Sequence, residues 1–347
     1  MHGCKVFFNN TLEWKSVFAV FTNSTNVQRI AMTLLRNNLY KCDISDEFDD
    51  VYFTNEEGAC TVHTFFNCLC CAFEPNGHTF SNIICLHLYE GISKADTNTT
   101  DIHFDFINGL EKAVHIWTPQ NYDKNDNTKK YGVVYMFDGQ NLFNENSTSC
   151  GSWNVPQIMN MRGDYIVVGI DNGDKYRNSQ LTPNIGKTKE IYNAIFSNGT
   201  GVFTAQLVVN KIIPYVNKNY NVFTDKEHTV VCGSSSGGLE SFYIGMTYSN
   251  VFGLIGSLSP AFVIYDDSVW NRFLKGVDIN NAPRLYLYTG ANDIFEEELY
   301  PQIEHMKVLL DNNGYDAAKM VYECRKYNYH NEACWSGVFA KFVSLLK

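Results

Sequence analysis

The sequence lacks the features that mark membrane proteins and nucleic-acid-binding proteins. No apolar run in its 347 residues approaches the ~20 residues that a membrane-spanning helix needs. Lys and Arg total 27 against 37 Asp and Glu, which gives a net charge of −10, and the basic residues form no block. Such a chain is repelled by the phosphates of nucleic acids and of anionic membranes. We therefore expect no nucleic-acid partner and no membrane, while the oligomeric state stays open.

Internal repeats and low-complexity segments are also missing, which excludes collagen, coiled coils and global disorder. Hydrophobic residues make up 45% of the chain and charged residues 18%, so there is enough apolar material for a sizeable core. At about 150 residues per domain, the length fits two domains or one large one.

The eleven cysteines lack the spacing of a metal site. Seven lie in the first 85 residues, and the cluster of Cys68, Cys70 and Cys71 has no paired C-x₂-C units and no H-x₃₋₅-H after it. We therefore expect no metal. One or two disulfides in a secreted N-terminal domain account for the cysteines better.

The first residues, Met1-His2-Gly3-Cys4-Lys5, lack the apolar core and the cleavage site of a secretion signal. The protein is therefore either cytoplasmic, or extracellular with its signal already removed from this sequence. The clustered cysteines favour the extracellular location, because disulfides persist in oxidising compartments.

The first quarter of the chain contains short runs rich in β-branched and aromatic residues, with polar turns between them. These runs lie at 5–8, 16–21, 51–53 and 61–66. Their pattern predicts a small all-β sandwich over residues 1–92. Residues 93–102 are mostly polar and have no apolar periodicity at their start, so we interpret them as a linker.

From residue 103 to 347, continuous apolar runs alternate with longer helix candidates. Buried strands are expected at 131–137, 165–170, 229–232 and 284–288, and helices at 203–215, 238–248, 296–313 and 331–346. Strand and helix in alternation predict an α/β fold with a mostly parallel central sheet.

The sharpest chemical signal is Gly233-x-Ser235-x-Gly237, which follows an expected strand and opens an expected helix. This is the pattern of a nucleophile elbow, where small neighbours let the strand and helix approach and the serine hydroxyl projects from a tight turn. The backbone N–H of Ser236 would then lie at a helix start and face a developing oxyanion.

A nucleophilic serine needs a base and an acid, in the chain order serine, acid, histidine. His330 lies in a loop before the last helix and is the candidate base, whereas His305 falls inside a predicted helix. Asp293 follows the penultimate strand and is the candidate acid; Glu296 and Glu297 are close competitors, and a helix cap is the alternative role of Asp293.

Polar residues after the other strands complete the expected site. The backbone N–H of Gln140 follows the strand that ends at Phe137 and is the second oxyanion candidate, unless Asp138-Gly139 forms only a turn. Four residues in loops are candidates for substrate binding or for structural roles: Trp153, Asp171, Asn172 and Arg177.

These motifs, in this order, resemble the putative-esterase group of α/β-hydrolases, which includes esterase D, siderophore esterases, mycolyltransferases and family 1 carbohydrate esterases. The resemblance spans residues 103–347 and includes 134–143, 167–172, the elbow 233–239 and His330-Asn331-Glu332-Ala333-x-Trp335. It implies an α/β-hydrolase fold with Ser235, Asp293 and His330 as the catalytic triad.

Residues 4–67 are similar to a starch-binding-type carbohydrate-binding module, through the Val6-Phe7-Phe8-Asn9 strand, Trp14 and the run at 17–21. The resemblance implies that Trp14 and Tyr52 stack on sugar rings. A place in the core is their alternative role.

We conclude that the sequence predicts a serine carboxylic-ester hydrolase acting through an acyl-enzyme on a polysaccharide or another ester. The β-rich module favours feruloyl or acetyl groups on plant polysaccharide. The alternatives are a siderophore or small thioester (S-formylglutathione-type) hydrolase, and a non-catalytic carbohydrate-binding protein on a hydrolase scaffold. No cofactor is expected, because the triad supplies base and electrophile.

Overall fold

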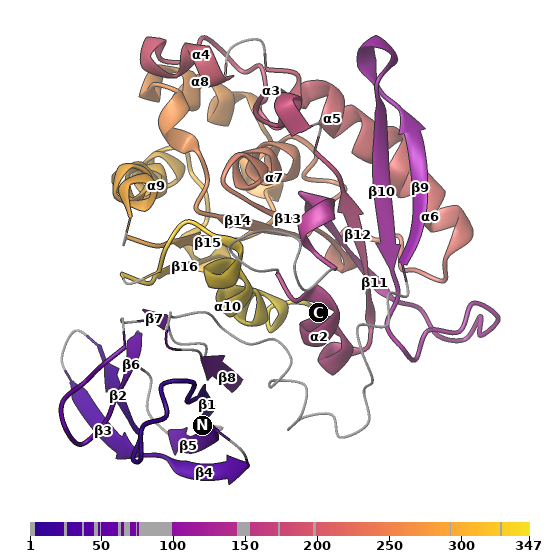
Figure 1. Cartoon of the computed structure of the whole chain (residues 1–347). Coiled ribbons are helices and arrows are strands. Elements are labelled where there is room, and N and C mark those ends of the chain that lie inside the picture. The colour runs from indigo at the N-terminus through magenta and orange to yellow at the C-terminus, as the bar shows by residue number, and fades with distance from the viewer. Residues whose placement is uncertain are drawn as a thin grey trace.

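The structure is a computed structural model, and the residues it describes fall into ranges separated by short gaps. They are 4–23, 26–36, 38–44, 48, 50–61, 64–65, 70–73, 75, 99–143, 153–172, 174–196, 199–291, 293–326 and 328–347. Figure 1 shows a small β-rich N-terminal region and a larger unit of helices around a central sheet. The expected fold class, a mostly parallel α/β sheet preceded by a β-rich region, is confirmed.

The N-terminal region consists of two four-stranded sheets, in the orders β4-β5-β1-β8 and β3-β2-β6-β7. The strands are β1 (Cys4–Asn9), β2 (Phe18–Thr22), β3 (Val27–Ala31), β4 (Thr33–Arg36), β5 (Leu39–Ile44), β6 (Asp50–Thr54), β7 (Thr64–Phe65) and β8 (Cys70–Phe73). Buried aromatic side chains hold the region together, and the rings of Phe8 and Phe53 stack with centroids 4.2 Å apart.

Part of the expected N-terminal organisation differs in the structure. The strand expected at 61–66 is only the two-residue β7. Residues 99–102 of the expected linker begin a strand of the central sheet, and residues 93–98 lie outside the described residues. The expected disulfides stay a prediction, because Cys68, Cys85 and Cys150 are not among the described residues.

The central sheet has eight strands in the order β16-β15-β14-β13-β11-β12-β10-β9. Their bounds are β9 (Thr99–Asp105), β10 (Glu111–Trp117), β11 (Gly132–Phe137), β12 (Tyr165–Ile170), β13 (Thr229–Ser234), β14 (Leu254–Leu258), β15 (Arg284–Thr289) and β16 (Met320–Cys324). The six strands from β16 to β12 in this order are parallel to one another. At the other edge, β10 runs antiparallel to β12, and β9 runs antiparallel to β10. β11, β12 and β13 are buried along their whole length, as expected where helices cover both faces.

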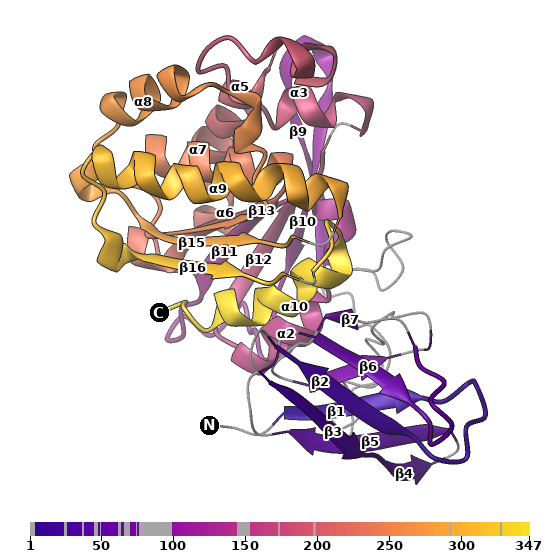
Figure 2. The same ribbon diagram turned by 90° about the vertical axis from the view of Figure 1, so that its left-hand side faces the viewer.

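Helices cover the two faces of the sheet with separate hydrophobic cores. The helices are α2 (Val155–Arg162), α3 (Arg177–Gln180), α4 (Asn193–Phe196), α5 (Gly201–Leu207), α6 (Ile213–Asn219), α7 (Ser236–Thr247), α8 (Asp267–Gly276), α9 (Ile294–Asn312) and α10 (Glu332–Val343). α2 and α10 pack on one face, and α5 to α9 on the other (Figure 1). Figures 1 and 2 both show the N-terminal sheets on the side of α2 and α10.

The helix expected at 203–215 is two helices, α5 and α6, joined by a π-helical segment at Val208–Ile212. Pro214 lies in the first turn of α6. Proline has no N–H to donate to the preceding turn, and a π-helical widening accommodates that loss without breaking the direction of the helix.

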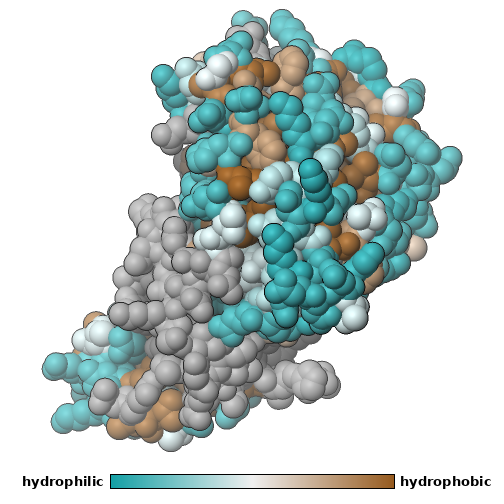
Figure 3. All heavy atoms as spheres, turned by 90° about the vertical axis from the view of Figure 1, so that its right-hand side faces the viewer, coloured by the Kyte–Doolittle hydropathy of each residue, from teal (hydrophilic) through white to brown (hydrophobic). Residues whose placement is uncertain are grey.

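The outer edge of the sheet is polar. β9 exposes alternate side chains, among them Asp101, His103 and Asp105. Charged residues on an edge strand oppose pairing with a strand of another molecule. Figure 3 looks onto this side of the molecule and shows hydrophilic residues over much of it, with apolar residues scattered among them. Among the helices that the structure describes, none combines the length and apolarity that crossing a bilayer requires.

Candidate active site

Ser235 lies in a strained turn between β13 and α7. Its φ of 58° and ψ of −122° fall in a region that L-amino acids rarely adopt. Three backbone hydrogen bonds hold the turn: the N–H of Ser235 donates to Leu258 O over 2.9 Å, and its carbonyl accepts from Ala261 N over 3.2 Å and Leu239 N over 3.0 Å. The geometry is that of a nucleophile elbow, as the sequence predicted.

Two glycines make the elbow sterically feasible. A Cβ on Gly233 would lie 2.5 Å from the carbonyl oxygen of Gly237, and one on Gly238 would lie 2.7 Å from the carbonyl oxygen of Leu258. Both contacts involve backbone atoms, which cannot move aside cheaply. Helix α7 therefore packs against β13 and β14 only because these positions lack side chains.

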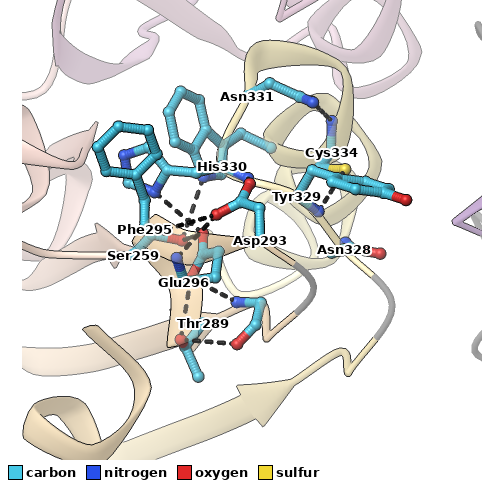
Figure 4. Close-up of polar contacts among 12 residues, drawn as sticks. Ser259, Thr289, Asp293, Phe295, Glu296, Asn328, Tyr329, His330, Asn331 and Cys334 are labelled. Atoms are coloured by element: carbon cyan, nitrogen blue, oxygen red, sulfur yellow. Dashed lines mark hydrogen bonds and ion pairs between the residues drawn. The ribbon is translucent and has the colours of Figure 1, made fainter. Parts of the chain in front are cut away.

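His330, the expected base, faces a buried carboxylate other than the expected one. Its Nδ1 atom lies 3.1 Å from Oε1 of Glu296, whose side chain is 0% exposed. The rings of Phe295 and Trp335 flank the imidazole at 5.7 and 4.9 Å between centroids. Figure 4 shows the Glu296 carboxylate beneath the imidazole.

The structure corrects the expectation for Asp293, which does not contact the imidazole. One of its oxygens accepts hydrogen bonds from the backbone N–H groups of Phe295, over 3.0 Å, and Glu296, over 2.9 Å, so it caps α9. The other accepts from the backbone N–H of His330 over 2.6 Å. The loop-to-helix boundary, which made Asp293 stand out in the sequence, is also where a short acidic side chain serves best as a cap.

All donors around Glu296 are in place for an ionised carboxylate. Oε2 accepts from the hydroxyl of Thr289 over 3.2 Å and from the backbone N–H of Gly290 over 3.0 Å. Oε1 accepts from the hydroxyl of Ser259 and faces His330. A carboxylate offers about four lone-pair sites, and here each oxygen has two partners. Glu296 can therefore orient the imidazole and balance the charge it gains as a base.

The two expected oxyanion donors lie at helix starts. Ser236 is the first residue of α7, where backbone N–H groups have no partner within the helix. Gln140 lies in a 3₁₀ turn after β11, entered through Asp138 with a left-handed φ of 58°. A Cβ at Gly139 would lie 2.6 Å from the carbonyl carbon of Gly169, so the turn needs this glycine. The oxyanion roles themselves stay predictions.

Arg177 and Asn172 act on Asp138 rather than reaching freely into solvent. The guanidinium of Arg177 donates to both oxygens of Asp138 over 2.7 Å, and Asn172 Nδ2 donates to one of them over 2.7 Å. Burial alone would raise the pKa of Asp138, but the adjacent Arg177 and Asn172 hold it below its ordinary value. The three residues thus fix the turn that carries Gln140, and Arg177 also lines the cavity described below.

Two other expected substrate-binding residues lie away from the site. Trp153 is 1% exposed and stacks on Trp335 at 5.9 Å between ring centroids, so it is a core residue and the expectation was wrong. Asp171 lies 2.9 Å from Nε2 of His115 and does not line the cavity. Trp153 lies just before α2, and Asp171 lies just after β12. The sequence pattern alone does not show whether a residue at such a position lines a substrate cavity or packs elsewhere.

The expected sugar-binding aromatics are both half-buried. Trp14 stacks on Phe8 with centroids 6.0 Å apart and packs against the N-terminal core. Tyr52 lies on β6 between the buried Val51 and Phe53 and is itself only partly exposed. Sugar binding by Trp14 and Tyr52 stays a prediction.

A cavity of about 430 Å³ opens over Ser235 and His330. Most of its wall is apolar or aromatic, and these residues are Tyr192, Ile195, Phe196, Ala261, Val263, Ile264, Phe295, Leu299 and Trp335. Its polar lining consists of Asn141, Arg177, Asn178, Ser235, Ser236, Glu298, His330 and Glu332. The apolar wall could not be foreseen from the sequence, because its residues come from short segments without a periodic pattern. In the described part of the chain, no His, Cys, Asp and Glu side chains are grouped as metal ligands.

The chain is similar to known proteins over much of its length. The uncharacterized protein YbbA of Bacillus subtilis (strain 168) is 25% identical over 168 residues, which is 48% of this chain and 64% of that protein, just under two thirds of its length. The enterobactin esterase of Shigella flexneri has 15% identity and a TM-score of 0.56, covering 96% of this chain and 88% of its own. A ferulic acid esterase from Anaeromyces mucronatus has 19% identity and a TM-score of 0.50, covering 74% of this chain and 94% of its own. The model of a family described as "Putative esterase" matches residues 109–341, and the chain belongs to that family.

Proposed function

We propose that the protein is a serine carboxylic-ester hydrolase that works through an acyl-enzyme. One observation carries the proposal. The strained Ser235 and His330 line the same cavity, and the Nδ1 atom of His330 faces the carboxylate of the buried Glu296. A serine, a base and an acid held on separate elements are the parts that ester hydrolysis needs.

Each residue has one step in this mechanism. Ser235 Oγ attacks the ester carbonyl while His330 takes its proton, and Glu296 stabilises the imidazolium. The N–H groups of Ser236 and Gln140 hold the oxyanion of the tetrahedral intermediate. The proton on His330 then goes to the departing alcohol, leaving an acyl group on Ser235. A water molecule, activated in the same way, releases the acid and restores the serine.

The cavity wall supports an aromatic acyl group such as feruloyl over acetyl. Tyr192, Phe196 and Phe295 offer aromatic surface, and the volume of about 430 Å³ falls in the range of small-molecule sites. An acetyl group would leave most of this apolar wall in contact with water. As part of the proposal, the feruloyl group is carried on a plant polysaccharide outside the cell, and the N-terminal region binds the sugar chain.

A second candidate is a siderophore esterase. The structural match to the enterobactin esterase extends over 96% of this chain and so includes the N-terminal region. The charge of the cavity favours the feruloyl ester instead. Two carboxylates, Glu298 and Glu332, line the cavity. Among the described lining residues, Arg177 is the one Lys or Arg, and its guanidinium is bound by both oxygens of Asp138. Anionic catecholates would meet net negative charge there.

The test is acid release from a panel of esters, with Ser235→Ala as the control. The panel contains methyl ferulate, acetylated xylan, p-nitrophenyl acetate, a catecholate tri-ester and S-formylglutathione. We expect methyl ferulate to be turned over best, with a loss on the order of 10⁴- to 10⁶-fold in kcat in Ser235→Ala. Fastest turnover of the catecholate or the thioester would replace the feruloyl assignment with that substrate. If no ester reacts and a fluorophosphonate fails to label Ser235, the protein is a binding protein instead of an enzyme.

A further inference from the structure

A chain of two hydrogen bonds ends at the Oε1 atom of Glu296. The hydroxyl of Ser259 donates to Oε1, the same oxygen that faces His330. The indole N–H of Trp335 donates in turn to Ser259 Oγ over 3.2 Å. Figure 4 shows Ser259 and His330 converging on the Glu296 carboxylate.

We propose that Ser259 and Trp335 form a positioning pair for the carboxylate, in which the indole N–H directs the serine hydroxyl onto Glu296. The inference rests on the proposed function, since it assigns roles around the same catalytic carboxylate. Neither residue is required to touch the reacting atoms for this role.

The direction of the hydrogen bonds follows from the chemistry of the groups. An indole N–H can only donate, so the contact with Trp335 makes Ser259 Oγ an acceptor. An ionised carboxylate can only accept, so the one hydroxyl proton of Ser259 goes to Glu296. Ser259 and Glu296 are 0% exposed and Trp335 is 5% exposed, so water does not compete for these contacts. Such a chain is stronger than its isolated links, because each hydrogen bond polarises the next.

The backbone around Ser259 supports a dedicated role for its side chain. Ser259 follows β14 and has a left-handed φ of 42°. Its N–H donates to Tyr288 O over 2.7 Å, which ties the strained residue to β15. Backbone strain of this kind persists where the surroundings fix it and clusters at functional sites. Here the strain directs the side chain toward the N-terminal turn of α9, where Glu296 lies.

Trp335 also links the carboxylate to the substrate cavity. Its ring lines the cavity and meets the imidazole of His330 nearly edge-on, with an interplanar angle of 82°. An acyl group that packs on this ring would immobilise the donor of the chain. Substrate binding and orientation of Glu296 are coupled through one side chain.

A matched control lies two residues earlier in the chain, on β14. Ser257 is buried like Ser259, but its hydroxyl donates to the carbonyl oxygen of Gly238 over 2.8 Å and not to Glu296. Ser257→Ala and Ser259→Ala each remove one buried hydroxyl. Only the second removes a donor from the carboxylate.

The experiment measures the rate at which a fluorophosphonate labels Ser235, as a function of pH, in the full chain. The variants are Ser259→Ala, Trp335→Phe, their combination, and Ser257→Ala. We expect Ser259→Ala to slow labelling ~10- to 100-fold, the range for losing a hydrogen bond to a charged group. The acidic limb of the rate profile should move to higher pH, because a carboxylate with one donor fewer holds the imidazolium proton more tightly. A role confined to folding would not move that limb.

The combined variant separates a chain from two independent effects. Trp335→Phe keeps an aromatic ring in place and should slow labelling less than Ser259→Ala. The part of the Trp335→Phe loss that passes through Ser259 should vanish when Ser259 is already alanine, so the double variant should lose less than the two single losses combined. Additive losses, an unchanged pH profile, or an equal loss in Ser257→Ala would each overturn the inference. If Ser259→Ala does not fold, the pH profile of Trp335→Phe decides. An unlabelled wild-type protein would instead refute the proposed function.

Discussion

Two carboxylates at the start of α9, those of Glu296 and Asp293, have different partners, so we expect different losses of activity when each is replaced by its amide. Glu296 faces the imidazole of His330, whereas Asp293 holds only backbone N–H groups. Glu296→Gln keeps the size of the side chain but offers the imidazole an amide, so the neutral ring can adopt the wrong tautomer. We expect kcat for the best ester to fall about 10³- to 10⁴-fold. Steady-state kinetics on purified protein measures it.

Asp293→Asn is the matched comparison. The amide oxygen can still cap α9, and only the hydrogen bond to the backbone of His330 is lost. We expect a loss of about tenfold or less in kcat and a stability decrease of about 1 kcal/mol. A larger loss for Asp293→Asn than for Glu296→Gln would return the acid role to Asp293.

Phe295 predicts the acyl preference. Its ring is 59% exposed and lines the cavity next to His330. In Phe295→Ala we expect KM for methyl ferulate to rise roughly tenfold, because an aromatic pair and its buried area are lost. KM for p-nitrophenyl acetate should change less than threefold, because the small acetyl group has little surface to pack on this ring. Equal effects on both esters would place the acyl group elsewhere in the cavity.

The residues of the site differ in how far the sequence could locate them. Ser235 and His330 could be found, because a tight turn and a loop before the last helix leave local signals. Glu296 could only be named as a competitor, since choosing it over Asp293 requires the direction of a side chain one helical turn away. Trp153 was misassigned because an aromatic residue in a loop can enter the core as readily as a cavity.

At the scale of the elements, burial decides which could be predicted. The strands β11, β12, β13 and β15 are buried on both faces and show as continuous apolar runs, so the expected bounds agree with the observed ones within two residues. Residues 99–102, the first part of the edge strand β9, fall in the expected linker, because about half of the side chains of this strand are polar and exposed. The π-helical junction between α5 and α6 depends on Pro214 and on tertiary packing, and the spacing of apolar residues in the sequence does not reveal it.

His115 joins three elements and predicts a pH dependence of stability. Its ring lies 2.9 Å from Asp171, after β12, and 2.6 Å from Asp101 on β9. The hydrogen bond with Asp171 raises the pKa of His115 to about 9, against burial, with Asp101 adding to the effect. A raised folded-state pKa stabilises the fold fully below the unfolded value of ~6.5, and this stabilisation is lost as pH rises through 9.

The measurement compares denaturant unfolding of the wild-type protein and His115→Gln at pH 6 and pH 9.5. We expect the variant to be about 1–2 kcal/mol less stable at pH 6, after allowance for solvent screening at this partly exposed site, and the gap to shrink at pH 9.5. Burial lowers the pKa of Lys112 to about 8, so the contribution of Lys112 to stability rises with pH instead of falling. Lys112 is present in both the wild-type protein and His115→Gln, so its contribution cancels in the difference between their stabilities. A gap that stays constant or widens with pH would contradict the assignment.

At the scale of the whole molecule, the N-terminal region and the α/β unit predict separable functions. Tyr52 is a partly exposed residue of β6 outside the N-terminal core cluster, whereas Trp14 packs against that cluster. We expect Tyr52→Ala to weaken adsorption to feruloylated polysaccharide severalfold while turnover of methyl ferulate is unchanged. Trp14→Ala should lower stability by about 1–3 kcal/mol instead. Pull-down on insoluble polysaccharide measures the adsorption, and thermal unfolding measures the stability. Unchanged adsorption in Tyr52→Ala would rule out sugar binding by Tyr52.

The antiparallel pair at the outer edge of the sheet has a consequence for synthesis on the ribosome. β9 and β10 are joined by a short turn at Ile107–Gly109, so this hairpin needs no later residue to form. The strand that it pairs with in the sheet, β12, leaves the ribosome only some fifty residues afterwards. The edge of the sheet can therefore form first, before the turn that carries Ser235 and the helix that carries Glu296 have been synthesised.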